Sequence, residues 1–319
     1  MNILITGCAG FIGFHLTKSL LFQGYKIVGI DNLNTYYNLK LKQKRISELE
    51  HKNFNFLKLD INQIEEVKGT FDLVINLAAQ AGVRVPLKFE QHYLSTNIEG
   101  FEAVVNFCDH RDINNLIYAS SSSVYDDQGV MPFCEEKTLL SPKSNYGKSK
   151  LENEKLAHKR ACYKDNKINF VGLRFFSVYG PYGRPDMAYY LFTKLLCQNK
   201  PIELRNKGSM ARDMTYIDDI ISGINLTIEF MTKTNSSVKS ELFNLGNDHP
   251  IYTIDLLSYL QNALSVSANI MHVKAEYESQ VTHANLEKSN KILGYNPKIS
   301  IEEGLNRFLD WYKFYENEA

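Results

Sequence analysis

Tyr146 and Lys150 lie four residues apart in the polar stretch SPKSNYGKSKLENEKLAHKR, residues 141–160. If this stretch is a helix, the two side chains share one face and are one turn apart. A lysine ammonium so placed can lower the pKa of a neighbouring phenol and make the tyrosine a usable base. An ordinary solvated helix also produces this spacing. The pair is therefore a candidate acid/base group that the rest of the sequence must support.

A glycine-rich turn near the N-terminus is the second candidate. Gly7, Gly10 and Gly13 are spaced three apart in ILITGCAGFIGFHL, between an apolar run and a helix-like pattern. Such glycines allow a tight turn and let a helix N-terminus approach a pyrophosphate closely. Asp31 follows the next apolar run, KIVGI, where a carboxylate can bind the hydroxyls of an adenosine ribose and repel a 2′-phosphate. The pattern predicts a dinucleotide site that prefers NAD to NADP, although Asp31 could instead cap a turn.

A run of serines supplies the third candidate. YASSSSVY, residues 118–125, ends another apolar run ahead of Tyr146. In an open parallel sheet, strand ends of this kind face the ligand crevice, so the hydroxyls could reach a substrate. Taken alone, a serine run is more often a loop.

These candidate residues must be positioned by a fold, and the alternation of predicted strands and helices indicates which fold. Short β-branched runs alternate with longer amphipathic runs, which predicts parallel strands joined by right-handed helical crossovers. The expected fold is α/β, a Rossmann-type doubly wound parallel sheet with a smaller C-terminal substrate-binding lobe. Residues 1–175 are the expected NAD-binding domain, and residues 176–319 mainly the substrate-binding lobe, with some segments returning to the first domain. Strands are expected at 2–6, 26–30, 54–59, 71–76, 115–120 and 168–175.

The composition excludes several classes of function. The 319 residues include 36 Lys and Arg against 36 Asp and Glu, so no overall basic field points to nucleic acid or a membrane surface. Five scattered cysteines without a CxxC pair suit free thiols in a reducing compartment, and the eight histidines form no ligand motif, so no metal is expected. The start, MNILITGCAG, lacks signal-peptide features, and the expected location is the cytoplasm.

Six segments, three of them from the candidates above, carry a family resemblance: TGCAGFIG, NLAAQAGVR, SSSSVY, YGKSK, LRFFSVYGPYGRPDM and RDMTYIDDI. With them, residues 1 to about 313 resemble the extended short-chain dehydrogenase/reductase family, and most of all its nucleotide-sugar epimerases acting on UDP-glucuronate. The resemblance implies that Tyr146 is the acid/base and that Lys150 lowers its pKa and binds the nicotinamide ribose. It implies Ser121 as the hydroxyl partner, assisted by Ser122. It also implies NAD as cofactor, a UDP-sugar as substrate and a homodimer.

The resemblance assigns binding residues position by position. For the dinucleotide it implies Gly7, Gly10, Phe11, Ile12, Gly13, Asp31, Asn32, Asp60, Ile61, Leu77, Ala79 and Asn97, with Tyr146 and Lys150. For the substrate it implies Arg84, Ser121, Ser122, Ser177, Arg184 and Arg212. Arginine suits a carboxylate or diphosphate, although each arginine could instead form a surface ion pair. The chain departs from the family pattern at Asp126, which replaces a glycine, and at Gln280, which replaces an aspartate.

The residues before the valine of SSSSVY bear on the reaction. Dehydratases of similar fold carry an Asp-Glu pair there and related decarboxylases a glutamate, whereas this chain has Ser122 and Ser123. The resemblance therefore implies oxidation of the sugar at carbon 4, a transient 4-keto sugar, and return of the hydride to its opposite face. The expected activity converts UDP-glucuronate to UDP-galacturonate. The main alternative is a UDP-glucose/UDP-galactose-type 4-epimerase on a neutral or N-acetylated sugar. A 4,6-dehydratase, a decarboxylase and a non-catalytic NAD-binding protein are further alternatives.

Overall fold

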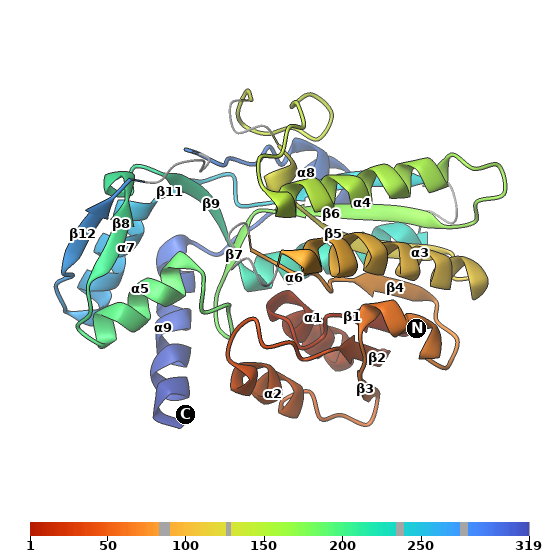
Figure 1. Ribbon diagram of the computed structural model, residues 1–319, viewed down its shortest axis with the longest axis horizontal. Helices are drawn as coiled ribbons and strands as arrows, with labels where there is room; N and C mark the ends of the chain where they lie inside the picture. The colour runs from red at the N-terminus through yellow and green to blue at the C-terminus, as the bar shows by residue number, and fades with distance from the viewer. Residues whose placement is uncertain (83–89, 126–128, 234–238, 275–279, 319) are drawn as a thin grey trace.

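A seven-stranded parallel sheet forms the centre of the molecule (Figure 1). The computed structural model describes residues 1–82, 90–125, 129–233, 239–274 and 280–318. The strand order is β10-β6-β5-β4-β1-β2-β3, and every neighbouring pair is parallel. The strands are β1 (Asn2–Thr6), β2 (Lys26–Asp31), β3 (Phe54–Lys58), β4 (Leu73–Asn76), β5 (Asn115–Ser121), β6 (Asn169–Phe175) and β10 (Ser240–Leu245). The six expected strands are confirmed, and β10 is an addition that the sequence did not indicate.

Helices cover both faces of this sheet, as the doubly wound prediction requires. In β1, Ile3 and Ile5 pack in one apolar cluster with α1 and α6, whereas Leu4 packs in a second cluster with α3 and α4. A parallel strand with both faces buried is apolar at nearly every position, which explains the sequence NILIT. The four helices are α1 (Phe11–Phe22), α3 (Gly100–His110), α4 (Asn145–Ala161) and α6 (Ile217–Lys233).

The C-terminal half adds two small sheets. One has the order β11-β9-β7 and the other pairs β12 with β8. With α5 and α7, β8 and β12 gather at one end of the molecule, at the left of Figure 1. These elements are β7 (Ser177–Tyr179), β8 (Ile202–Arg205), β9 (Ala211–Tyr216), β11 (Pro250–Tyr252), β12 (Ile270–Val273), α5 (Ala188–Cys197) and α7 (Thr253–Leu264).

The remaining helices complete the covering of the sheets. They are α2 (Leu39–Ser47), α8 (Glu287–Leu293) and α9 (Ile301–Glu318), with short 3₁₀ helices at Ile61–Glu66, Ser122–Val124 and Asn206–Gly208. A π-helical segment, Tyr93–Glu99, runs directly into α3. Within the described ranges, no helix combines the length and apolar character needed to cross a membrane.

A buried ion pair attaches α4 to the sheet. Arg174 on β6 donates from Nε and NH2 to the two carboxylate oxygens of Glu154 on α4, at 2.8 and 2.7 Å. Both residues are almost completely buried. Ser120 at the end of β5 donates to Glu154 Oε1 at 2.5 Å, and Arg174 NH1 donates to the hydroxyl of Tyr125 at 2.9 Å. Because two charges without water are stable only when well paired, this network fixes α4 relative to β5 and β6.

Glu154→Gln is expected to destabilise the protein by about 3–5 kcal/mol, because it leaves the Arg174 guanidinium buried without a counter-charge. Urea unfolding of the variant and the unmodified protein measures the loss. Glu152→Gln is the matched control, since the Glu152–Lys155 pair on the same helix is exposed and its removal should change stability by less than about 0.5 kcal/mol. Equal losses in the two variants would contradict an anchoring role for Glu154.

Candidate active site

One large cavity lies at the carboxyl ends of the central strands, where an open parallel sheet binds its ligands. Its volume is about 1550 Å³, whereas a site for a single drug-sized ligand occupies about 300–1,000 Å³. The cavity therefore suits two ligands lying next to each other. The predicted site residues that line it are Gly7, Gly10, Phe11, Ile12, Gly13, Asp31, Asn32, Ile61, Leu77, Ala79, Ser121, Ser122, Tyr146, Lys150, Ser177, Arg184 and Arg212.

Two predicted cofactor residues, Asp60 and Asn97, are not among the residues that line the cavity. Asp60 accepts a hydrogen bond from Asn32 Nδ2 at 2.8 Å. Asn97 accepts one from the backbone N–H of Gln80 at 2.8 Å and donates one to Ser149 Oγ at 2.9 Å. Both thus support residues of the cavity wall or of α4. Two further positions, 84 and 126, carry Arg84 and Asp126 and lie outside the described residues.

The glycine turn has the shape that a pyrophosphate site needs. Gly7 has a positive φ of 72°, and a Cβ there would come within 2.7 Å of the backbone nitrogen of Ala78. A Cβ on Gly13 would come within 2.2 Å of the Gly7 carbonyl oxygen. Helix α1 follows with Gly10 as its N-cap, so no side chain caps its first N–H groups. Those donors border the cavity and can bind an anion.

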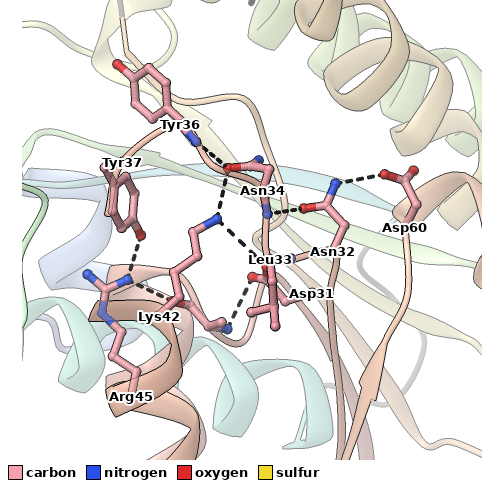
Figure 2. Close-up of polar contacts among 10 residues, drawn as sticks. Asp31, Asn32, Leu33, Asn34, Tyr36, Tyr37, Lys42, Arg45 and Asp60 are labelled. Atoms are coloured by element: carbon pink, nitrogen blue, oxygen red, sulfur yellow. Dashed lines mark hydrogen bonds and ion pairs between the residues drawn. The ribbon is translucent and has the colours of Figure 1, made fainter. Parts of the chain in front are cut away.

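Asp31 is held in place at the end of β2 and lines the same cavity. Figure 2 shows the side chain among its polar contacts. Its Oδ2 accepts from the backbone N–H of Ala9 at 3.2 Å, and its Oδ1 accepts from that of Leu33 at 2.8 Å. The fixed carboxylate can bind ribose hydroxyls, which is the role expected of it. Lys42 Nζ lies 4.0 Å from Asp31 Oδ1. The sequence did not single out Lys42, because LKLKQKR has the composition of a solvated helix face.

Tyr146 and Lys150 lie in the first turns of α4, one turn apart as their spacing predicted. Ser144 caps this helix and accepts from the backbone N–H of Gly147 at 3.0 Å. Lys150 Nζ lies 6.0 Å from the centroid of the Tyr146 ring and donates to the Ala119 carbonyl oxygen at 2.8 Å. Ser121, the last residue of β5, hydrogen-bonds with Tyr146. Sheet and helix thus bring three of the four predicted catalytic residues together, and the fourth, Ser122, follows Ser121 and lines the same cavity.

The charges around this group set its protonation. Burial raises the pKa of Tyr146, while the positive charge of Arg184 and the hydrogen bond with Ser121 act in the opposite direction. Burial lowers the pKa of Lys150 to about 8, against the attraction of Glu154 for the ammonium. Arg184 and Ser121 therefore favour the phenolate, and the same effect expected of Lys150 stays a prediction.

Arg184 forms an ion pair that the sequence did not indicate. Its Nε and NH2 donate to the two oxygens of Asp186 at 3.0 and 2.5 Å, and the hydroxyl of Tyr36 donates to Asp186 Oδ2 at 3.1 Å. Burial alone would raise the pKa of Asp186, but Arg184 and Tyr36 hold that pKa below its ordinary value. All three residues line the cavity. An anionic ligand at Arg184 must therefore share the guanidinium with Asp186 or displace it.

Ser177 and Arg212 line the part of the cavity formed by the C-terminal half of the chain. Ser177 begins β7, and Arg212 lies on β9, where its NH1 donates to the Ala211 carbonyl oxygen at 2.9 Å and approaches that of Gln280 at 3.5 Å. Burial lowers the pKa of Arg212. A guanidinium in a largely buried wall can bind a diphosphate through paired hydrogen bonds.

Comparison with known proteins gives consistent matches over almost the whole chain. The NAD dependent epimerase/dehydratase family matches residues 3–246. An uncharacterized protein of Methanocaldococcus jannaschii is 42% identical, over 98% of this chain and 96% of its own length. UDP-glucuronate 4-epimerase 4 of Arabidopsis thaliana is 37% identical, over 99% of this chain and 76% of its own length.

A solved structure is similar in fold as well as in sequence. The crystal structure of UDP-glucuronic acid 4-epimerase from Bacillus cereus, in complex with UDP-glucuronic acid and NAD, has a TM-score of 0.89 and 34% identity. The match covers 99% of this chain and 100% of that chain.

The lowered pKa of Lys150 has a consequence for stability. In nucleotide-free protein the folded state releases the Lys150 proton at about pH 8, whereas the unfolded state holds it to about pH 10.4. Between these values the unfolded state binds more protons, so stability rises with pH. Relative to Lys150→Met, the protein is expected to gain up to about 1.4 kcal/mol per pH unit in this window. Denaturant unfolding of both proteins at several pH values measures this gain. A difference in the free energy of unfolding between the two proteins that does not change with pH would contradict the prediction.

Proposed function

The chain belongs to the NAD dependent epimerase/dehydratase family, and from this premise we propose that it is an NAD-dependent 4-epimerase interconverting UDP-glucuronate and UDP-galacturonate. The observation that carries the proposal is that Ser121, Tyr146 and Arg184 meet in one cavity, a hydroxyl and a base with a cation suited to a carboxylate. The similarity to UDP-glucuronate 4-epimerases over nearly the full chain supports this choice of substrate.

The cofactor half of the cavity fits NAD. The uncapped N-terminus of α1 behind the glycine turn binds the pyrophosphate, and Asp31 binds the adenosine ribose. Lys150 binds the nicotinamide ribose, near Tyr146. NAD supplies the acceptor and later the donor of the hydride at carbon 4. Phe11, Ile12, Asn32, Ile61, Leu77 and Ala79 form the walls of this half.

Tyr146 acts as the acid/base of the reaction. It removes the proton from the 4-hydroxyl of the sugar and returns a proton to the 4-oxygen after the sugar has turned over. Because burial raises its pKa, the phenolate depends on stabilisation by Arg184 and by the hydrogen bond with Ser121. The serines at 122 and 123 provide no carboxylate for eliminating water, which argues against dehydration.

The uronate imposes a further requirement, because its 4-keto form is a β-keto acid that loses carbon dioxide readily. Loss is prevented if the carboxylate is held so that the breaking bond stays out of line with the carbonyl π system. We assign this restraint to the hydroxyls of Ser121, Ser122 and Ser177, together with Arg184. All four side chains belong to residues that line the cavity.

One observation favours a second candidate, a UDP-glucose-type 4-epimerase. Asp186 already compensates the charge of Arg184. A neutral sugar could therefore bind beside Arg184 without leaving its guanidinium unpaired. Arg212 binds the diphosphate in either case.

The arrangement of the chain supports three accompanying proposals. Residues 1–175 mainly bind NAD, and residues 176–319 mainly bind the UDP-sugar. The protein acts in the cytoplasm as a homodimer. The homodimer is the pairing that the resemblance to the extended short-chain dehydrogenase/reductase family implies.

Tyr146→Phe is expected to lower turnover by about 10²- to 10⁴-fold while NAD still binds, because the proton acceptor is lost and the ring still packs. Separation of the nucleotide-sugar products measures turnover, and titration with NAD measures binding. Ser144→Ala is a useful comparison, because it removes the cap of α4 at a residue that also lines the cavity and should reduce stability while lowering turnover far less than Tyr146→Phe. Near-normal turnover of Tyr146→Phe would refute its role.

Arg184→Ala is expected to reduce turnover of both substrates, because Arg184 stabilises the phenolate of Tyr146. It should reduce turnover of UDP-glucuronate by about a further 10- to 100-fold, because only the uronate supplies an anion. The two substrates are incubated side by side with each protein, and the products are separated. Release of a decarboxylated pentose product by the variant would support the restraint of the carboxylate. Equal loss on both substrates would leave Arg184 with its effect on Tyr146 or a diphosphate or folding role, and would remove the main support for the uronate.

A further inference from the structure

Lys42 is a buried cation at the end of the cavity that is proposed to hold the adenosine ribose. It lies on α2, its side chain is 6% exposed, and it lines the cavity. Figure 2 shows Nζ between two acceptors, 2.9 Å from Asn34 Oδ1 and 4.0 Å from Asp31 Oδ1. The ammonium also lies 5.2 Å from the centroid of the Tyr37 ring.

These contacts do not use the full capacity of the ammonium. A lysine has three N–H donors, and burial of an ammonium is costly unless its donors are used. Among the described residues, the single acceptor within hydrogen-bond distance of Nζ is Asn34. Asp31 already accepts from two backbone N–H groups and does not depend on Lys42 for its orientation. Donor capacity therefore remains at a point that borders the cavity.

Arg45, on the same helix, shows how a purely structural cation is used here. Its NH1 donates to the Ala9 carbonyl oxygen at 2.7 Å and to the hydroxyl of Tyr37 at 2.6 Å, and its NH2 donates to the Tyr182 carbonyl oxygen at 2.6 Å. Arg45 is fully buried and is not among the lining residues. It joins two segments of backbone and the Tyr37 side chain, whereas Lys42 reaches the cavity.

We propose that Lys42 is a second cofactor-recognition residue, which donates to the adenosine ribose of NAD while Asp31 accepts from it, and which holds a 2′-phosphate once the Asp31 charge is removed. A vicinal diol both donates and accepts hydrogen bonds, so a carboxylate and an ammonium side by side match it. A 2′-phosphate can only accept from such a pair, and Asp31 repels it. The inference rests on the proposed NAD role, but it concerns binding and not epimerisation.

The two residues thus affect the choice of cofactor in opposite directions. Asp31 disfavours NADP, and Lys42 provides a cation that would bind the extra phosphate. The preference for NAD depends on the carboxylate outweighing the ammonium. A single neutralising change at Asp31 should therefore create affinity for NADP, and that gain should require Lys42.

Lys58 is the alternative source of a cation and supplies the matched control. It is aligned with Asp31 across β2 and β3, but it is exposed and is not a lining residue. If the phosphate were bound from the neighbouring strand, Lys58 and not Lys42 would be needed.

The test is calorimetric titration of the nucleotide-free, full-length protein with NAD⁺ and with NADP⁺, which gives a ratio of Kd values for each variant. Asp31→Asn should shift this ratio toward NADP⁺ by about 10- to 100-fold, the value of one charge-assisted interaction. Adding Lys42→Met to Asp31→Asn should reverse most of that shift, and adding Lys58→Met should leave it in place. Thermal unfolding of each variant establishes that it is folded.

Two results would overturn the proposal. In one, Lys42→Met leaves the ratio of Kd values unchanged both alone and with Asp31→Asn, so that Lys42 only supports the fold. In the other, Lys58→Met removes the gain in NADP⁺ binding. Because the readout is binding, loss of epimerase activity in any variant does not affect the outcome. Conversely, failure of the uronate assignment would leave this test intact.

Discussion

The ion pair between Arg174 and Glu154 is the constraint on which the catalytic geometry depends. It joins β6 to α4 without access to water, and Ser120 ties the same carboxylate to β5. Helix α4 carries Tyr146 and Lys150, and β5 ends at Ser121, so the pair fixes the distance between the base and its hydroxyl partner. Glu154 also offsets part of the effect of burial on Lys150. One buried interaction therefore fixes the position of the proposed catalytic group and moderates the effect of burial on the Lys150 ammonium.

Each of the two parts of the cavity has a cationic side chain in its wall beside a carboxylate. Lys42 lies beside Asp31, and Arg184 is bonded to Asp186. Each cation is brought into a poorly solvated wall together with an acid, which limits the cost of burying it before a ligand arrives. An incoming ribose or carboxylate then competes with, or complements, a carboxylate of the protein. The choice of ligand in such a site depends on how the cation and the carboxylate of each pair offset one another, and not on a single charge.

The sequence was sufficient for whatever depends on local pattern. The strands β1–β6, the glycine turn, and the spacing of Tyr146 and Lys150 follow from hydrophobic alternation, backbone freedom and helix periodicity. It was insufficient where contacts join distant segments. Asp186 and Tyr36 are far apart in the chain and meet only after folding. Lys42 has the same neighbours in sequence as a solvated lysine, and its burial becomes visible only when α2 packs beside β2. The strand β10 was missed because its partner, β6, is separated from it by several helices.

The position of β10 in the sheet has a consequence for the synthesis of this protein on the ribosome. Until Ser240–Leu245 emerges, β6 is an open edge that carries Phe170, Val171 and Leu173, side chains that are fully buried in the finished molecule. An unpaired apolar edge invites pairing with other chains. A nascent chain or a fragment ending at residue 175 would contain most of the cavity end proposed to bind the dinucleotide and still lack the strand that pairs with β6. The seven-stranded sheet around the N-terminal strands is therefore complete only when a segment of the C-terminal half is present.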